Sequence, residues 1–149
     1  LPQIRFYVVG SKVTDEIKAL EAEDNGIVIK GFVSEEELAS LYESCRIVVV
    51  PLRYGAGVKG KVVEAIYNGA PIVTTSVGAE GIPDVEEMLE IADEPLEFAQ
   101  KVVALYQDEA RLFKMAKKTQ EYIKKHFSLD GAWSVIEEDF KEETQECRQ

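Results

Sequence analysis

Short apolar runs alternate with segments of helical periodicity along the first two thirds of the chain. The runs at 4–9, 27–29, 47–50 and 71–75 are rich in β-branched residues and have the length of strands. A weaker run covers residues 88–91. Because strands that alternate with helices form parallel sheets, the pattern predicts an α/β fold with helices on both faces of a parallel sheet.

The segments that follow these runs carry helical spacing and helix-start signals. Ser34 and Glu37 have the spacing of a capping box, in which Ser34 accepts from the Glu37 backbone N–H while the Glu37 side chain reaches back. Pro95 suits the first position of a helix, and Asp108 can cap another. We expect helices over 14–24, from Ser34 past Tyr42, over 60–68, from Pro95 past Leu105, from Asp108 past Tyr122, and around Trp133, Ile136 and Phe140.

Length and composition fit one soluble globular domain, or half of a larger enzyme. The 149 residues are 46% apolar and 30% charged. No apolar run approaches the roughly 20 residues of a membrane span, so we expect no transmembrane segment. The chain starts at Leu1 with no initiator Met and no signal region, so we expect a cytoplasmic piece cut from a longer protein. Cys45 and Cys147 lie too far apart for a metal or redox motif, which fits a reduced cytosolic protein.

Charge is distributed unevenly along this acidic chain. The net charge of −11 argues against a nucleic-acid surface. Yet residues 44–79 contain one acid, Glu64, together with the basic residues Arg46, Arg53, Lys59 and Lys61. Buried strands avoid charge and would explain the missing acids, but they do not explain the paired lysines.

The glycine-rich segment 51–59 leads into the helix that begins near Lys59 or Gly60. Glycines let the backbone approach a ligand closely, and a helix start offers free N–H groups and a positive dipole end. A phosphate fits there, and Glu64, one turn further, suits the hydroxyls of a neighbouring ribose. The alternative is a flexible loop with a solvated Glu64, since neither GxGxxG nor GxxxxGK[ST] is present.

Other chemistry finds little support in the sequence. The single histidine, His126, ends the basic stretch 124–126, where it suits a helix C-terminus better than catalysis. No His, Cys and Asp cluster has metal-ligand spacing, so we expect no metal. The expected strands end at Gly10, Gly31, Pro51 and Ser76 rather than at a lone Asp, which argues against a phospho-acceptor domain.

Several motifs follow one another in a specific order over residues 31–82. They are Gly31–Val33, Leu41–Cys45, Val48–Pro51, Gly57–Ala65, Asn68–Val73 and Gly78–Ile82. In this order they resemble the donor-binding half of the retaining glycosyltransferases of family 4, also called group 1, which have the GT-B fold. The segment from Phe98 through Phe127–Ser128 also resembles the closing helices of that family.

The resemblance implies a fold and a division of roles. Residues 1–149 would form a single donor-binding domain, a Rossmann-like three-layer α/β sheet that is the C-terminal half of a GT-B enzyme. This domain would hold a UDP- or GDP-sugar, and the sugar would pass, with retention and without a metal or other cofactor, to an acceptor on a missing N-terminal domain. Alone, the fragment is expected to be inactive.

The resemblance also implies the donor-binding residues. Glu64 resembles the second acid of the E-x7-E motif, which binds the ribose, and the backbone of Lys59–Lys61 resembles the diphosphate cradle. The Gly31–Val33 corner resembles the place that holds the base. The complete set is Gly10, Gly31, Phe32, Val33, Gly57, Val58, Lys59, Gly60, Lys61 and Glu64.

One departure from the family motif affects the expected chemistry. The first acid of E-x7-E, which contacts the donor sugar, falls at Ala56, so no catalytic residue is assigned. The sequence fits instead the subset that reads G-x-G-x-K-x-K-x-x-E. Two alternatives remain: a sugar-nucleotide epimerase of the same fold, and a non-catalytic nucleotide-binding domain, which the loss at Ala56 favours.

Overall fold

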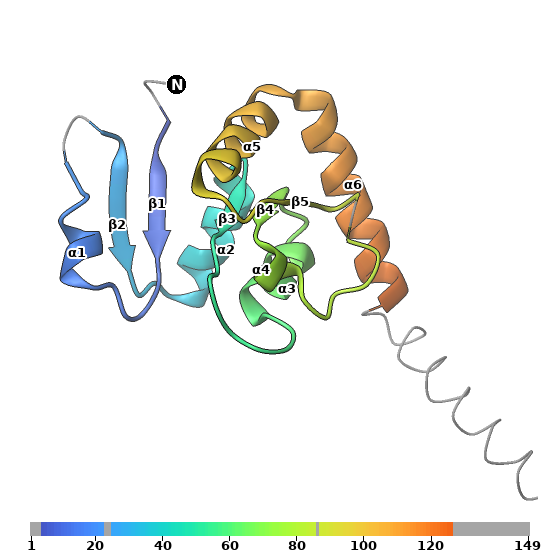
Figure 1. The fold of residues 1–149 in the computed structure, drawn as a ribbon, viewed down its shortest axis with the longest axis horizontal. Helices are drawn as coiled ribbons and strands as arrows, with labels where there is room; N and C mark the ends of the chain where they lie inside the picture. Colours follow the sequence, from blue (N-terminus) through green and yellow to red (C-terminus); the bar gives the residue numbers. More distant parts are fainter. Residues whose placement is uncertain (1–3, 23–24, 86, 127–149) are drawn as a thin grey trace, which may run out of the picture. The chain divides into compact units, whose positions relative to one another are not determined.

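The computed structural model describes residues 4–22, 25–85 and 87–126 (Figure 1). The chain divides into two compact units, Leu1–Glu43 and Ser44–Gln149. Each unit contains a parallel sheet flanked by helices, and each is described by itself.

The first unit contains two parallel strands and two helices. Its elements are β1 (Phe6–Val9), α1 (Asp15–Lys18), β2 (Ile27–Gly31) and α2 (Glu35–Ser44), whose last residue lies at the boundary between the units. Strand β1 pairs with β2 from the Phe6–Ile27 position onward.

The helix expected over 14–24 is much shorter than predicted. Thr14 caps α1 as its N-cap residue, but the helix ends at Lys18. The Asn25 amide donates to the Leu20 carbonyl at 2.6 Å, and its oxygen accepts from the Ile27 N–H at 3.0 Å. This side chain stabilises a turn that competes with further helical hydrogen bonds.

The capping box at the start of α2 is half formed. The Glu37 backbone N–H donates to Ser34 Oγ at 3.2 Å, as predicted. The Glu37 carboxylate, however, pairs with Lys30 at 2.9 Å. A charged partner is thus available on the neighbouring strand, and this ion pair raises the pKa of Lys30.

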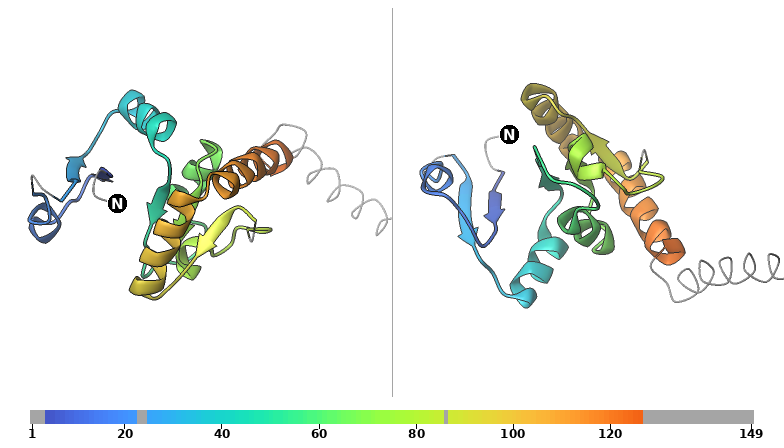
Figure 2. Two further views of the ribbon diagram at one scale, coloured as in Figure 1. Left: turned by 90° about the horizontal axis from the view of Figure 1, so that it is seen from above. Right: turned by 60° about the horizontal axis from the view of Figure 1, so that its bottom comes forward.

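The second unit is a three-stranded parallel sheet with the order β3–β4–β5 (Figures 1 and 2). Its elements are β3 (Val48–Val50), α3 (Gly60–Tyr67), β4 (Ile72–Thr74), α4 (Ser76–Ala79), β5 (Leu89–Ile91), α5 (Pro95–Gln107) and α6 (Glu109–His126). The three strands predicted in this unit are confirmed within about one residue, and its three longer helices begin within about one residue of the predicted positions. Helix α4 was not predicted, and the helix expected around Trp133 lies outside the described residues.

Helices cover both faces of this sheet. Val73 of β4 is fully buried in a cluster with Leu105, Leu112 and Met115 of α5 and α6. Thr74 points to the opposite face because successive strand residues alternate, and there it lies against Gly78 of α4. The predicted α/β class, with parallel strands flanked by helices, is confirmed.

Helix starts in this unit follow the predicted signals. Pro95 occupies the first turn of α5, and Asp108 Oδ1 accepts from the Arg111 backbone N–H at 2.9 Å before α6. Within the described residues, no helix is long and apolar enough to cross a membrane.

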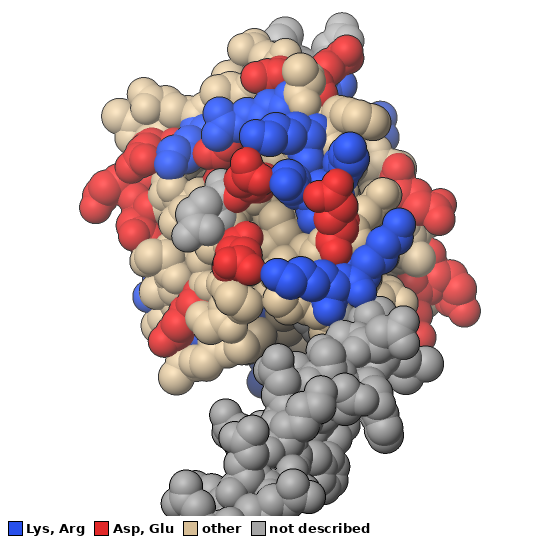
Figure 3. Space-filling view, turned by 90° about the vertical axis from the view of Figure 1, so that its right-hand side faces the viewer, with Lys and Arg blue, Asp and Glu red and all other residues tan. Residues whose placement is uncertain are grey.

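Basic and acidic side chains alternate on the face that carries α6 (Figure 3). Glu87 lies between two lysines of this helix, at 3.0 Å from Lys118 and 3.3 Å from Lys114. Lys125 pairs with Asp84 at 3.7 Å. Lys114, Lys118 and Lys125 of this helix are therefore each paired with an acid.

We predict that Lys118→Met raises the pKa of the Glu87 carboxyl toward its usual value. Hydrogen bonds from Lys118 and Lys114 hold this pKa low. The pairing therefore stabilises the fold at pH values above the ordinary pKa of glutamate, and this stabilisation is lost as the pH falls through the lowered pKa. NMR titration of the carboxyl carbon at low salt measures the change. Lys117→Met is the control, because Lys117 pairs with Glu121 instead. Equal titration curves for both variants would contradict the assignment.

Candidate functional site

The candidate site lies at the carboxyl edge of the second unit's sheet. Since β3, β4 and β5 are parallel, their carboxyl ends meet at this edge, where ligands bind in open α/β sheets. Thr74 Oγ1 donates to the Val50 carbonyl at 2.9 Å, and Thr75 Oγ1 donates to the Leu52 carbonyl at 2.6 Å. The end of β4 therefore fixes the point at which the glycine-rich segment leaves β3.

The first turn of α3 offers unpaired backbone donors. The N-cap residue, Lys59, makes no side-chain cap, and its carbonyl accepts from Val62 and Val63 at 2.9 and 3.1 Å. Among the described residues, no acceptor lies on the N–H groups of Gly60 and Lys61. These donors and the helix dipole make this turn suitable for an anion.

The two lysines of this segment differ in their surroundings. The Lys59 ammonium lies 3.1 Å from Glu80 Oε2 and also donates to the Gly57 carbonyl, and its side chain is 10% exposed. Lys61 is exposed and pairs with no acid in the described part of the chain. Lys59 is therefore an internal contact of the loop, and Lys61 carries the charge that is available to a ligand.

Glu64 lies on the same side of α3 as the free donors. Residues three and four positions apart share a helix face, which places Glu64 beside Gly60 and Lys61. The opposite face buries Val62, Ala65 and Ile66. Glu64 is exposed, and no described side chain binds its carboxylate, so it is available to hydroxyl groups.

The glycine-rich loop packs against the segment after α4. Gly57 has a φ of +68°, in the left-handed region that favours glycine. A Cβ added at Gly81 would lie 3.0 Å from the Val58 side chain, which is itself 57% exposed. The loop thus rests on residues 80 and 81, and the Val58 side chain remains accessible.

The remaining predicted residues gather in the first unit. The Gly10 N–H donates to the Gly31 carbonyl at 2.8 Å, which joins the carboxyl ends of β1 and β2. Gly31 has a φ of +65°, Phe32 is 81% exposed, and Val33 is half-buried. The structure therefore brings Gly10 together with the Gly31–Val33 corner, and separately brings the 57–64 group together.

Two acids at the carboxyl edge were missed by the sequence reasoning. Asp93, just after β5, accepts from both the backbone N–H and the hydroxyl of Ser76, at 2.8 and 2.9 Å. Glu80 binds Lys59. Glu80 could have been noticed because it is the first acid after Glu64. Asp93 follows the run at 88–91, whose sequence gives only a weak strand signal.

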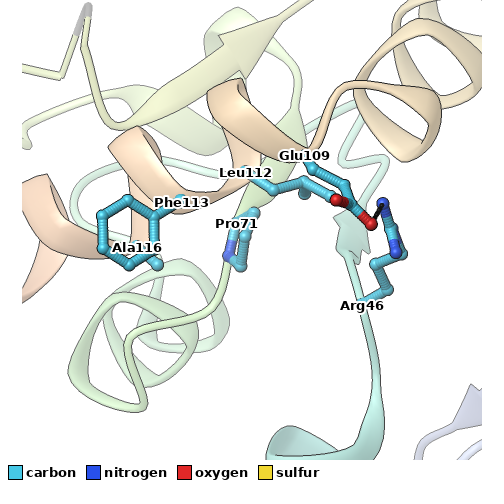
Figure 4. A pocket seen from close by; sticks show the side chains of 6 residues that line it. All are labelled: Arg46, Pro71, Glu109, Leu112, Phe113 and Ala116. Carbon is cyan, nitrogen blue, oxygen red and sulfur yellow. Dashed lines mark ion pairs between the residues drawn. The ribbon is translucent and has the colours of Figure 1, made fainter.

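A shallow surface pocket of ≈ 310 Å³ lies between the chain just before β3 and β4 and the first half of α6 (Figure 4). It is lined by Arg46, Pro71, Glu109, Leu112, Phe113 and Ala116. Arg46 and Glu109 face each other across it at 3.7 Å, and Phe113 is 75% exposed. The pocket contains none of the predicted donor-binding residues.

Other candidate chemistry is limited in the described part of the chain. No three His, Cys, Asp or Glu side chains there gather as a metal site. His126 is the last residue of α6, as predicted, and its ring lies 4.3 Å from that of Tyr122.

Comparison with known proteins identifies the family. A family model described as "Glycosyl transferases group 1" matches residues 1–108. An "Uncharacterized 44.6 kDa protein in cps region" of Klebsiella pneumoniae is 29% identical over 147 residues, which cover 95% of this chain and 37% of that relative. The chain therefore spans little more than a third of the length of the curated relative it matches. Because the family model covers well over half of the chain, the protein belongs to the group 1 glycosyltransferases.

Proposed function

We propose that residues 1–149 are the donor-binding domain of a retaining GT-B glycosyltransferase that transfers a sugar from a UDP- or GDP-sugar. Family membership supports a nucleotide sugar as the donor. The acceptor would bind to a separate N-terminal domain, transfer would need no metal, and the enzyme would act in the cytoplasm. Because the acceptor side is supplied elsewhere, residues 1–149 alone would not catalyse transfer.

The start of α3 carries this proposal. The unpaired N–H groups of Gly60 and Lys61, with the free charge of Lys61, suit the diphosphate. Glu64 lies on the same helix face and suits the two ribose hydroxyls, because a carboxylate can accept a hydrogen bond from each of them. The Gly31–Val33 corner of the first unit stays a prediction as the part of the chain that holds the base through its main chain.

Ala56 favours a second candidate, a nucleotide-binding domain without transferase activity. The side chain at position 56 has no group that could hydrogen-bond to a sugar. Product analysis of the intact protein separates the two candidates, because a non-catalytic domain binds the nucleotide and releases it unchanged.

Lys61→Ala and Glu64→Ala are each expected to weaken UDP or GDP binding about tenfold. Each change removes charge-assisted hydrogen bonds, which contribute about 1.5–3 kcal/mol, and 1.4 kcal/mol corresponds to a tenfold change in affinity. Isothermal titration of UDP and GDP into the intact protein measures the effect. Lys61→Ala should also reduce the salt dependence of binding, while Glu64→Ala should not.

Matched controls come from two exposed residues with no described ion-pair partner. Lys124→Ala removes a lysine charge at the far end of α6, and Glu94→Ala removes an acid before α5. Both should bind UDP and GDP like the unmodified protein. If the controls weaken binding as much as the site variants, or if the intact protein binds neither nucleotide, the proposed site is wrong.

A further inference from the structure

Glu80 lies against the glycine-rich loop although it follows a different strand. It comes just after α4, 21 positions from Lys59, and its Oε2 lies 3.1 Å from the Lys59 ammonium. The Glu80 side chain is 53% exposed, whereas the Lys59 side chain is 10% exposed. The carboxylate is therefore held on one side by a largely enclosed ammonium group and remains open to a ligand on its other side.

The Lys59 ammonium fixes where this carboxylate sits in the loop. The ammonium donates to the Gly57 carbonyl, and a Cβ added at Gly55 would lie 3.8 Å from the same nitrogen. Gly55 and Gly57 flank Ala56, so the turn 55–57 wraps around the ammonium that Glu80 binds. Glu80 thus supplies a carboxylate beside a turn whose central side chain is a methyl group.

The ion pair also decides which ligands this carboxylate tolerates. An unpaired carboxylate beside a diphosphate site would repel the ligand, but Lys59 balances the charge of Glu80. The carboxylate can accept about four hydrogen bonds, so Lys59 leaves most of its acceptor positions available. A neutralised acceptor of this kind suits hydroxyl groups rather than phosphate.

We propose that Glu80 binds hydroxyl groups of the sugar that is attached to the diphosphate. This inference rests on the proposed function, because it requires the diphosphate to sit at the start of α3. Glu80 would then contribute to the recognition of the sugar, while Lys61 and Glu64 hold the nucleotide. Lys59 acts as a positioning residue that orients and neutralises Glu80.

The experiment compares each nucleotide sugar with its own nucleoside diphosphate in the intact protein. Affinities are measured for UDP, UDP-glucose, UDP-galactose, UDP-N-acetylglucosamine, GDP, GDP-mannose and GDP-fucose. Glu80→Gln is expected to weaken binding of at least one nucleotide sugar about tenfold more than binding of its diphosphate, the effect of one charge-assisted hydrogen bond. Glu80→Asp keeps the charge but shortens the side chain, so it should also change the ratio of nucleotide-sugar affinity to diphosphate affinity.

Lys59→Met tests the positioning role of Lys59. It removes the cation that orients and neutralises Glu80, so it should change the ratio of nucleotide-sugar affinity to diphosphate affinity as Glu80→Gln does, and it should also weaken binding of the diphosphate itself, which the unbalanced carboxylate repels. If Glu80→Gln and Glu80→Asp leave the ratio unchanged for every sugar, Glu80 only stabilises the loop and the inference is wrong. If the unmodified protein binds neither UDP nor GDP, the proposed function itself fails.

Discussion

Leu105→Ala is expected to lower the free energy of unfolding by about 3 kcal/mol, within the range measured for leucine truncations in protein cores. Leu105 is 1% exposed and packs with Val73, Leu112 and Met115. This cluster joins α5 and α6 to the central strand β4. The truncation leaves a cavity there, because three separate elements cannot all close around the smaller side chain.

Urea denaturation followed by circular dichroism measures the loss for Leu105→Ala. Val103→Ala, in the same helix, is the matched control: Val103 is 44% exposed, and its truncation should cost less than about 1 kcal/mol. A similar shift of the urea midpoint for both variants would show that α5 does not pack on the sheet through Leu105.

The elements that the sequence predicts well are those with strong local signals. The apolar β-branched runs became β3 and β4, and Pro95 begins α5 at the expected position. The length of helix α1 was overestimated because hydrophobic spacing gives no sign of the turn that the Asn25 side chain stabilises. Helix α4 was missed because four residues are too few for a periodic pattern, and its cap by Thr75 depends on the end of β4.

The candidate site was predictable in its backbone but not in its charges. Glycines and a helix start can be read from sequence, so the segment 55–64 was located correctly at the carboxyl edge of the sheet. Lys59 and Lys61 look equivalent in sequence, yet Lys59 is bound by Glu80 and Lys61 is exposed. That difference depends on a contact between segments that lie 21 positions apart. The sequence marks Glu80 as the first acid after Glu64, but it does not show which lysine Glu80 binds.

Gly78→Ala is expected to lower the free energy of unfolding by about 2–3 kcal/mol. This loss is expected even though alanine is about 1 kcal/mol more favourable than glycine inside a helix. A Cβ at position 78 would lie 2.0 Å from Thr74 Oγ1 and 3.3 Å from Thr74 Cβ. Thr74 is fully buried, and its hydroxyl donates to the Val50 carbonyl at 2.9 Å. The added methyl group must therefore displace α4 or break the hydrogen bond between β4 and β3.

Two further variants test whether this clash is the cause. Gly60→Ala makes the same change at the start of α3, where an added Cβ meets nothing within 4 Å, so stability should stay equal or rise slightly. Thr74→Ala removes the atoms that the new methyl group would strike, so the double variant should lose clearly less stability than the sum of the two single changes. Urea denaturation of all four variants measures the coupling. Additive losses would mean that Gly78 is required for a reason other than its contact with Thr74, whereas a large coupling would establish that this helix reaches the sheet closely enough to admit only glycine.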